Sequence, residues 1–318
     1  MGNRIVRASR AILFGVLVMS CGCDADTSSL PIPNDPIPLV HDHPSWIGED
    51  RIAFQSIGAI RVECGGIQID DSAAGVVVMT LDGECKLAVP QGQTPAASSR
   101  LGQGICLIGS LAGPMVSFTS SDEDTVLEDA AWLRRSDLAL SDNGVWAAWR
   151  CCWEDHTVGV WVYRFDLGQS QFVGQGGFPT WKPGSEVLLY RGGEWRPCLI
   201  EYTASSGQRD TIRTFSEDYS SLEMCYSPDG EKIAYDRFGL TAGQSGLCIY
   251  DRVTGSEQLV NHRRATGLSW GPGGIVYTNG CGDCEDDGCG VLWIYDPESG
   301  SDRQLTTRLQ TVLRERSI

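Results

Sequence analysis

Two short polar segments hold the residues best suited to recognition or chemistry. Both place aromatic side chains beside charged ones, a combination typical of ligand-binding loops. The residues are Trp153, Glu154, Asp155, His156, Trp195 and Arg196. His156 and its neighbouring carboxylates could act as a general acid or base. The chain has no Gly-x-Ser-x-Gly, His-Glu-x-x-His or phosphate-loop motif. We therefore predict binding, with no catalytic residue and no cofactor.

Cysteines recur in comparable segments. Cys281 and Cys284 have the C-x-x-C spacing of metal ligands, but no histidine lies nearby to complete a zinc site with Cys289. Disulfides are the alternative in an exported chain, where they would staple long loops. We predict disulfides and no metal at five positions, with the connectivity left open. They are Cys151, Cys152, Cys281, Cys284 and Cys289.

The N-terminus has the features of an export signal. Three arginines precede the apolar run from Ala11 to Met19, which is too short to span a bilayer. The following Val18-Met-Ser-Cys21 resembles the bacterial lipobox, which implies cleavage after residue 20 and a lipid on Cys21. The alternative is a plain secretory signal. Of the 13 cysteines, lipidation of one leaves an even number, which permits complete pairing.

Residues 21–42 form a proline-rich tether that cannot build a core. By the same resemblance, Gly22 after the lipid site implies the outer rather than the inner membrane of a bacterial cell envelope. The formal net charge of −16 argues against nucleic acid as a partner.

A repeat begins at residue 43. An aromatic or leucine leads into a turn and then into an apolar strand. The leads are Trp46, Leu140, Trp181, Tyr226 and Trp270. The last four lie 41 to 45 residues apart, and the 94 residues before Leu140 leave room for one degenerate copy. We place that copy at about Pro90 to Arg135, with strands near Ile105, Met115 and Thr125.

A period of about 44 residues is that of a four-stranded propeller blade. The sequence therefore predicts an all-β, six-bladed β-propeller over residues 43–318, with the leads on the innermost strands. We expect loops between the second and third strands of the blades to form the binding face. A long loop at 56–74 should be one of them. A terminal strand, Ile37–Val40 or Thr311–Leu313, should close the ring.

The clearest repeat, Tyr226-Ser-Pro-Asp-Gly-Glu-Lys-Ile-Ala-Tyr235 followed by Leu247-Cys-Ile-Tyr-Asp251, resembles the TolB-type, WD40-like propeller repeat. Leu292-Trp-Ile-Tyr-Asp296 resembles it too. The resemblance implies the fold and no chemistry, because the motif's Asp and Gly make a turn. Two functions remain open. The first is a lipoprotein that binds a protein or an envelope polymer, and the second is a hydrolase or lyase acting on glycans or lactones at the channel mouth.

Overall fold

The structure is a computed structural model, and it describes residues 40–61, 67–82, 84–90, 92–98, 103–108, 115–119, 125–128, 134–152, 158–193, 196–216, 219–220, 223–239, 245–279 and 291–306. All of them lie in one compact unit, Pro36–Ile318. They contain no helix that could cross a membrane.

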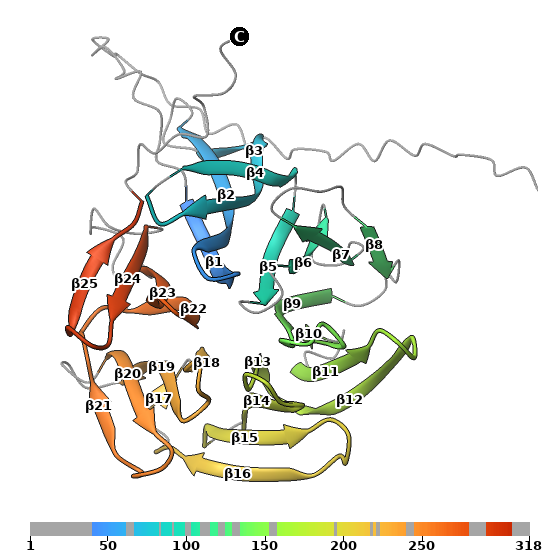
Figure 1. Cartoon of the computed structure of the whole chain (residues 1–318), viewed down its shortest axis with the longest axis vertical. Coiled ribbons are helices and arrows are strands. Elements are labelled where there is room, and N and C mark those ends of the chain that lie inside the picture. The colour runs from blue at the N-terminus through green and yellow to red at the C-terminus, as the bar shows by residue number, and fades with distance from the viewer. Residues whose placement is uncertain are drawn as a thin grey trace, which may run out of the picture. The chain divides into compact units, whose positions relative to one another are not determined.

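The described strands pair into six sheets (Figure 1). Sheet 1 consists of β1 (Val40–Ile47), β2 (Arg51–Arg61), β3 (Ile67–Thr80) and β4 (Cys85–Pro90), and sheet 2 of β5 (Gly92–Ser98), β6 (Gln103–Ile108), β7 (Met115–Thr119) and β8 (Thr125–Glu128). Sheet 3 consists of β9 (Arg134–Leu140), β10 (Trp146–Cys152), β11 (Val158–Arg164) and β12 (Gln169–Gln175), and sheet 4 of β13 (Gly177–Trp181), β14 (Val187–Gly192), β15 (Cys198–Thr203) and β16 (Arg209–Thr214).

Sheet 5 consists of β17 (Tyr219–Ser220), β18 (Met224–Tyr226), β19 (Lys232–Gly239), β20 (Gly246–Asp251) and β21 (Glu257–Leu259), and sheet 6 of β22 (Ala265–Gly271), β23 (Gly274–Asn279), β24 (Leu292–Asp296) and β25 (Ser301–Gln304). In sheet 5 the two short strands β17 and β18 both pair with β19. Each sheet is therefore a four-stranded antiparallel blade in plan, as the repeat predicts.

The innermost strands contact one another in ring order, β1, β5, β9, β13, β18, β22 and back to β1 (Figure 1). The molecule is thus an all-β propeller. The predicted leads Trp46, Trp181, Tyr226 and Trp270 all lie on these innermost strands. The degenerate copy is confirmed as sheet 2, whose strands match the expected order.

Hairpin turns explain the repeat motif. In sheet 5 the Ser227 hydroxyl accepts the backbone N–H of Lys232 at 2.9 Å, and Gly230 adopts a φ of 71°. Ser141 accepts Trp146 N–H at 2.9 Å in sheet 3, where Gly144 has a φ of 67°. A left-handed glycine after a polar cap reverses the chain within a few residues. The Ser-Pro-Asp-Gly motif is therefore a turn signal, as expected.

Ring closure is described only in part. Among the described residues every sheet is built from consecutive strands, and Val40 begins β1 rather than joining sheet 6. Trp46 lies at the junction of sheets 1 and 6: its Nε1 donates to Gly274 O at 3.1 Å, and its backbone N–H donates to Ser269 Oγ at 3.1 Å. Gly271 leaves the space, since a Cβ there would lie 2.3 Å from the indole. A buried aromatic side chain packed against glycine therefore joins the two sheets. The other candidate strand, 311–313, lies outside the described residues.

Two expected loops begin as strands. Most of segment 56–74 extends the β2–β3 hairpin, with Gly58 opposite Asp70 and Arg61 opposite Ile67 after a bulge. Cys151 and Cys152 belong to β10, opposite Gly159 and Val158. Periodic apolar residues mark only the part of a strand that packs in the core. Strand pairing continues past it because backbone hydrogen bonds do not depend on side-chain type.

Candidate functional site

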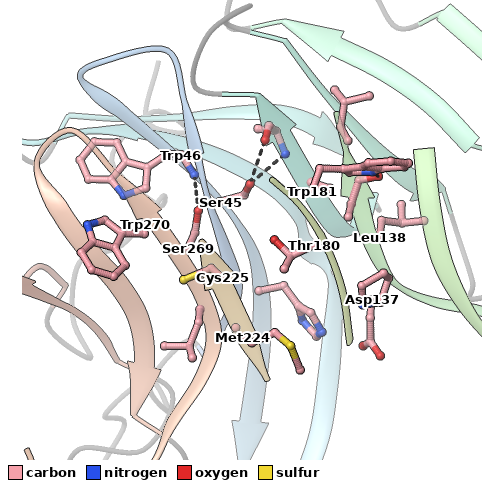
Figure 2. Close-up of a pocket in the computed structure, with 18 of the residues that line it drawn as sticks. Ser45, Trp46, Asp137, Leu138, Thr180, Trp181, Met224, Cys225, Ser269 and Trp270 are labelled. Atoms are coloured by element: carbon pink, nitrogen blue, oxygen red, sulfur yellow. Dashed lines mark hydrogen bonds between the residues drawn. The ribbon is translucent and has the colours of Figure 1, made fainter. Parts of the chain in front are cut away.

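A hollow of about 160 Å³ lies where the innermost strands of all six sheets meet. Figure 2 shows labelled side chains from five of these strands around it. The position three residues before each lead lies at a bulge in the innermost strand or, in sheet 5, directly before that strand begins. This position has positive φ at His43 (49°), Asp137 (50°), Phe178 (55°) and Gly267 (61°). Left-handed backbone at non-glycine residues costs energy and is concentrated at functional sites.

A second set of residues lies on the second strands, outside the residues that line the hollow. Each lead pairs with a residue of the second strand, as Trp181 pairs with Leu188 and Tyr226 with Ile233. The position three residues beyond that partner is called the rim position here. The rim positions are Gln55, Leu107, Arg150, Arg191, Asp236 and Thr278. In five sheets the rim residue is polar and follows an aromatic in the core.

In sheets 3 and 4 the rim is basic. Arg150 Nε lies 2.9 Å from Asp137 Oδ2, and its guanidinium carbon lies 5.1 Å from the centre of the Phe178 ring. Among the described residues Arg191 has no such partner, and its Nε is buried without a hydrogen bond. Burial, and then the positive charge of Arg150, lowers the pKa of Arg191. The described part of this rim therefore brings two guanidiniums together with one carboxylate, Asp137, which pairs with Arg150.

In sheets 5 and 6 the rim is acidic and polar. Asp236 is fully buried, and its Oδ1 accepts the backbone N–H of Ala265 at 3.2 Å, while its Oδ2 has no partner. Burial raises the pKa of Asp236 to about 7. Glu223 accepts the backbone N–H of Gly267. The Thr278 hydroxyl is buried without a partner. Neighbouring sheets therefore carry rim groups of opposite type, basic in sheets 3 and 4 and acidic in sheet 5.

The sequence-predicted residues lie beside this end of the channel or outside the described part. Strands β10 and β14 end at Cys152 and Gly192, two residues or fewer beyond the rim, so the segments that follow start there. Arg196 is exposed at the end of one of them. The other predicted ligand-binding residues fall outside the described ranges: Trp153, Glu154, Asp155, His156 and Trp195. So do Cys21, Cys281, Cys284 and Cys289.

The described cysteines correct one expectation. Cys198, Cys225 and Cys248 are thiols without a disulfide, each on a strand, so complete pairing is not found. Burial raises the pKa of Cys248 to about 12 and raises that of Cys225 as well. Such thiols remain protonated and unreactive at neutral pH. Cys225 and Cys248 are core residues, and Cys198 is half-buried. Cys151 is buried in β10, and its predicted disulfide remains a prediction.

Sequence reasoning missed His43, Asp137, Glu223 and Asp236. A signal for them exists, because three lie three residues before a lead and the fourth follows a buried aromatic. Within the described ranges no group of three or more His, Cys, Asp and Glu residues could hold a metal ion.

Comparison with known proteins identifies the fold. No protein-family model and no curated protein matches the sequence. Among solved structures, TolB from Acinetobacter baumannii is 12% identical, with a TM-score of 0.59 over 82% of this chain and 78% of that one. The chain folds as a TolB-like β-propeller. This establishes the fold that the repeat motif implies.

Other propellers are equally similar to this TolB-like chain. Oligogalacturonate lyase from Vibrio parahaemolyticus is 12% identical, with a TM-score of 0.56 over 87% of this chain and 80% of that one. The propeller domain of the Trilobed protease from Pyrococcus furiosus is 10% identical, with a TM-score of 0.55 over 86% and 99%. That domain is described as having an open velcro topology. Identities this low carry the fold alone.

Proposed function

We propose that the chain is an exported, six-bladed propeller that binds a protein or an envelope polymer at the rim end of its channel. The observation that carries the proposal is a group of four buried polar atoms without hydrogen-bond partners at or next to rim positions of the second strands. They are Ser56 Oγ, Arg191 Nε, Asp236 Oδ2 and Thr278 Oγ1. Buried polar groups in native proteins are nearly always hydrogen-bonded. Four exceptions at neighbouring ring positions support an external partner there.

Binding is favoured over catalysis because the carboxylates of the hollow are engaged. Asp137 faces Arg150, and Glu223 holds the backbone of Gly267. Both therefore stabilise the inner strands. A general acid or base would instead need a perturbed pKa and a free path to substrate. In this proposal the loops with Trp153, Glu154, Asp155, His156, Trp195 and Arg196 extend the binding face.

Photo-crosslinking in cell envelopes tests this proposal. A photo-reactive phenylalanine analogue replaces Trp195 and, as the control, Val253, which is 76% exposed in the outer turn of sheet 5. We expect a discrete crosslinked species, either to one protein or to the glycan fraction, from position 195 only. Equal crosslinking at both positions, or at neither, would show that the rim end is not the binding face.

A second function has one observation in its favour. His43, Asp137 and Glu223 line the same hollow, so a histidine and two carboxylates surround a space of small-ligand size. A propeller hydrolase or lyase acting on glycans or lactones would need such a set. Cleavage of oligogalacturonate or a lactone by the purified chain, lost in Glu223→Gln, would establish it. No turnover in the wild-type protein would remove it.

Export and anchoring form a separate part of the proposal. The apolar run and Val18 to Cys21 support a lipid on Cys21 and a place in the bacterial cell envelope, at the outer membrane. Radiolabelled fatty acid should enter the wild-type chain and be absent from Cys21→Ser. Equal labelling of the two proteins would contradict lipidation.

A further inference from the structure

The surroundings of Arg191 are unfavourable for a charged side chain. Its side chain is half-buried at the end of β14, and its Nε is buried without a hydrogen-bond partner. Its titratable neighbours are Arg150, a like charge, and Cys198, whose pKa is raised by burial so that the thiol stays neutral. In a chain with a net charge of −16, carboxylates to pair it are abundant. None of those described ion-pairs with it.

The backbone around Arg191 is shaped to bring the second arginine close. Gly177 lies opposite Arg191 in the β13–β14 ladder. A Cβ at Gly177 would lie 2.8 Å from Cδ of Arg150, so the Arg150 side chain crosses β13 at this glycine. Arg150 is fixed there by Asp137 on one side and by the Phe178 ring on the other. Two arginines from neighbouring sheets are therefore held near each other, and the carboxylate of Asp137 pairs with one of them, Arg150.

Two close guanidiniums repel each other and lose hydration, a cost that folding alone does not repay. The same pair is well suited to an oxyanion, because each guanidinium presents parallel N–H donors that match the oxygens of a carboxylate or a phosphate. Asp137 and Phe178, which contact Arg150, line the channel hollow, so the pair lies directly behind residues that a ligand in the hollow would meet.

We propose that Arg191 and Arg150 form an oxyanion subsite of the rim, which receives a carboxylate or phosphate group of the ligand. This inference rests on the proposed binding function and adds its chemistry. Arg191 is the primary donor, since Arg150 is already shared with Asp137. The neighbouring acidic rim of sheet 5 excludes a second anion and sets the orientation of the ligand.

Thermal unfolding and calorimetry of the full chain test the subsite. The proteins are wild type, Arg191→Gln, Arg191→Lys and the control Arg303→Gln, whose arginine is exposed on β25. Each is measured in sodium chloride, sodium acetate and sodium phosphate at equal ionic strength. In chloride we expect Arg191→Gln to unfold about 2 °C or more above wild type, because an unpaired charge is removed.

In acetate or phosphate, the order of the unfolding midpoints of these proteins should change. Acetate or phosphate should raise the midpoint of the wild type and of Arg303→Gln by about 2 °C or more, and that of Arg191→Gln by less. The affinity of the responding ion should fall at least about tenfold in Arg191→Gln. It should fall in Arg191→Lys too, since lysine keeps the charge but loses the parallel donors. A response to acetate alone identifies a planar carboxylate, and one to phosphate alone a tetrahedral group.

Equal midpoint shifts in wild type and Arg191→Gln would overturn the subsite. A destabilised Arg191→Gln in chloride would do so as well, because it would show that Arg191 has a structural partner. Crosslinking at residue 195 reports separately on the proposed function. A crosslink without an oxyanion response rejects the subsite only, and an oxyanion response without a crosslink rejects the macromolecular partner only.

Discussion

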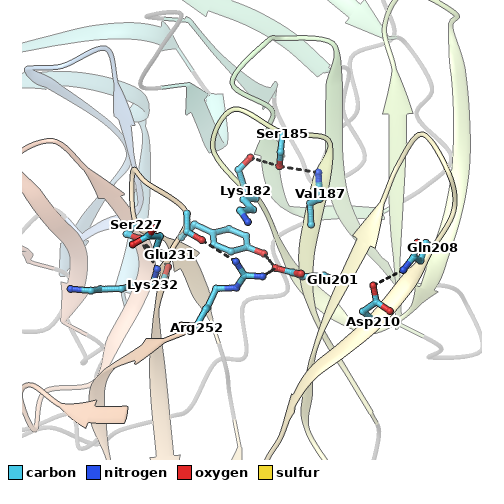
Figure 3. Close-up of polar contacts among 12 residues, drawn as sticks. Lys182, Ser185, Val187, Glu201, Gln208, Asp210, Ser227, Glu231, Lys232 and Arg252 are labelled. Carbon is cyan, nitrogen blue, oxygen red and sulfur yellow. Dashed lines mark hydrogen bonds and ion pairs between the residues drawn. The ribbon is translucent and has the colours of Figure 1, made fainter. Parts of the chain in front are cut away.

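Two regions of the propeller differ in how completely their charged side chains are hydrogen-bonded. In sheets 4 to 6 three half-buried carboxylates, Glu201, Glu257 and Asp302, each accept from two or more donors, and they are called the outer clusters here. Glu201 accepts the Tyr226 hydroxyl at 2.6 Å and the Arg252 guanidinium, a junction of sheets 4 and 5 shown in Figure 3. At the rim, Arg191 and Asp236 lie one sheet apart, and each leaves a buried polar atom without a partner.

The outer clusters repeat with the blades. Tyr235 and Tyr277 occupy equivalent positions, and each donates its hydroxyl to a carboxylate, Glu257 and Asp302 respectively. Burial and the adjacent carboxylate raise the pKa of both tyrosines. Complete pairing is what a structural network requires, because a half-satisfied one is costly. The contrast fits a structural role for the outer clusters and the binding role proposed for the rim.

The strongest test of this contrast is the Glu257→Ala variant. Glu257 joins sheets 4 and 5 by accepting from Arg213, Tyr235 and Arg237, the last at 2.6 Å. Its removal leaves two guanidiniums without their carboxylate, so we expect the free energy of unfolding to fall by about 3 kcal/mol. Urea denaturation measures it. Glu298→Ala, in an exposed turn, is the matched control and should change little. A loss at Glu257 no larger than that of the control would remove the distinction between the two regions.

A smaller effect of opposite sign is expected from Asp236→Asn. The pKa of Asp236 is raised from 3.8 to about 7 by burial, so the folded state binds a proton that the unfolded state releases. Wild-type stability should therefore be greatest below pH 4 with respect to this group, fall as the pH rises to about 7, and then level off. Asparagine keeps the acceptor for Ala265 N–H and cannot ionise. Near pH 8 the variant should be more stable by up to a few kcal/mol, on the order set by the pKa change.

Midpoints of unfolding at pH 5, 6, 7 and 8 measure this difference. Subtracting wild type from variant cancels the titration of other groups. The groups nearest Asp236 are Arg264, whose charge lowers the pKa, and the backbone of Ala265. A difference that does not change with pH would mean that Asp236 is already ionised in the folded protein, and the rim would lose its acidic member.

Most of the fold could be predicted from the sequence because each repeat is a local unit. A lead aromatic, a capped glycine turn and an apolar strand depend on residues close in sequence, as in Tyr226 to Tyr235. Even sheet 2 could be placed, since its short apolar runs fill one period. Closure could not be predicted, because the fit of Trp46 against Gly271 joins residues from opposite ends of the propeller.

The candidate site was only partly predictable. The loops after β10 and β14 were expected at the binding face, and both start beside the rim. No motif or spacing in the sequence singles out Arg150 or Asp236. Their burial arises only when six sheets pack around one axis. The special conformations of His43 and Asp137 arise from inner-strand bulges, which hydrophobic periodicity does not report.

The smallest expected changes in the free energy of unfolding come from substitutions at two adjacent residues of β23. Tyr277 donates its hydroxyl to Asp302 at 2.9 Å, whereas the hydroxyl of Thr278 is buried at the rim without a partner. Tyr277→Phe should therefore lower the free energy of unfolding by about 1 kcal/mol or more, since Asp302 loses a donor. Thr278→Val keeps the shape and removes an unsatisfied hydroxyl, so it should be neutral or stabilising by up to about 1 kcal/mol. Urea denaturation of both variants measures the pair. Two losses of similar size would show that Thr278 is hydrogen-bonded in solution, and the rim would then be satisfied internally like the outer clusters.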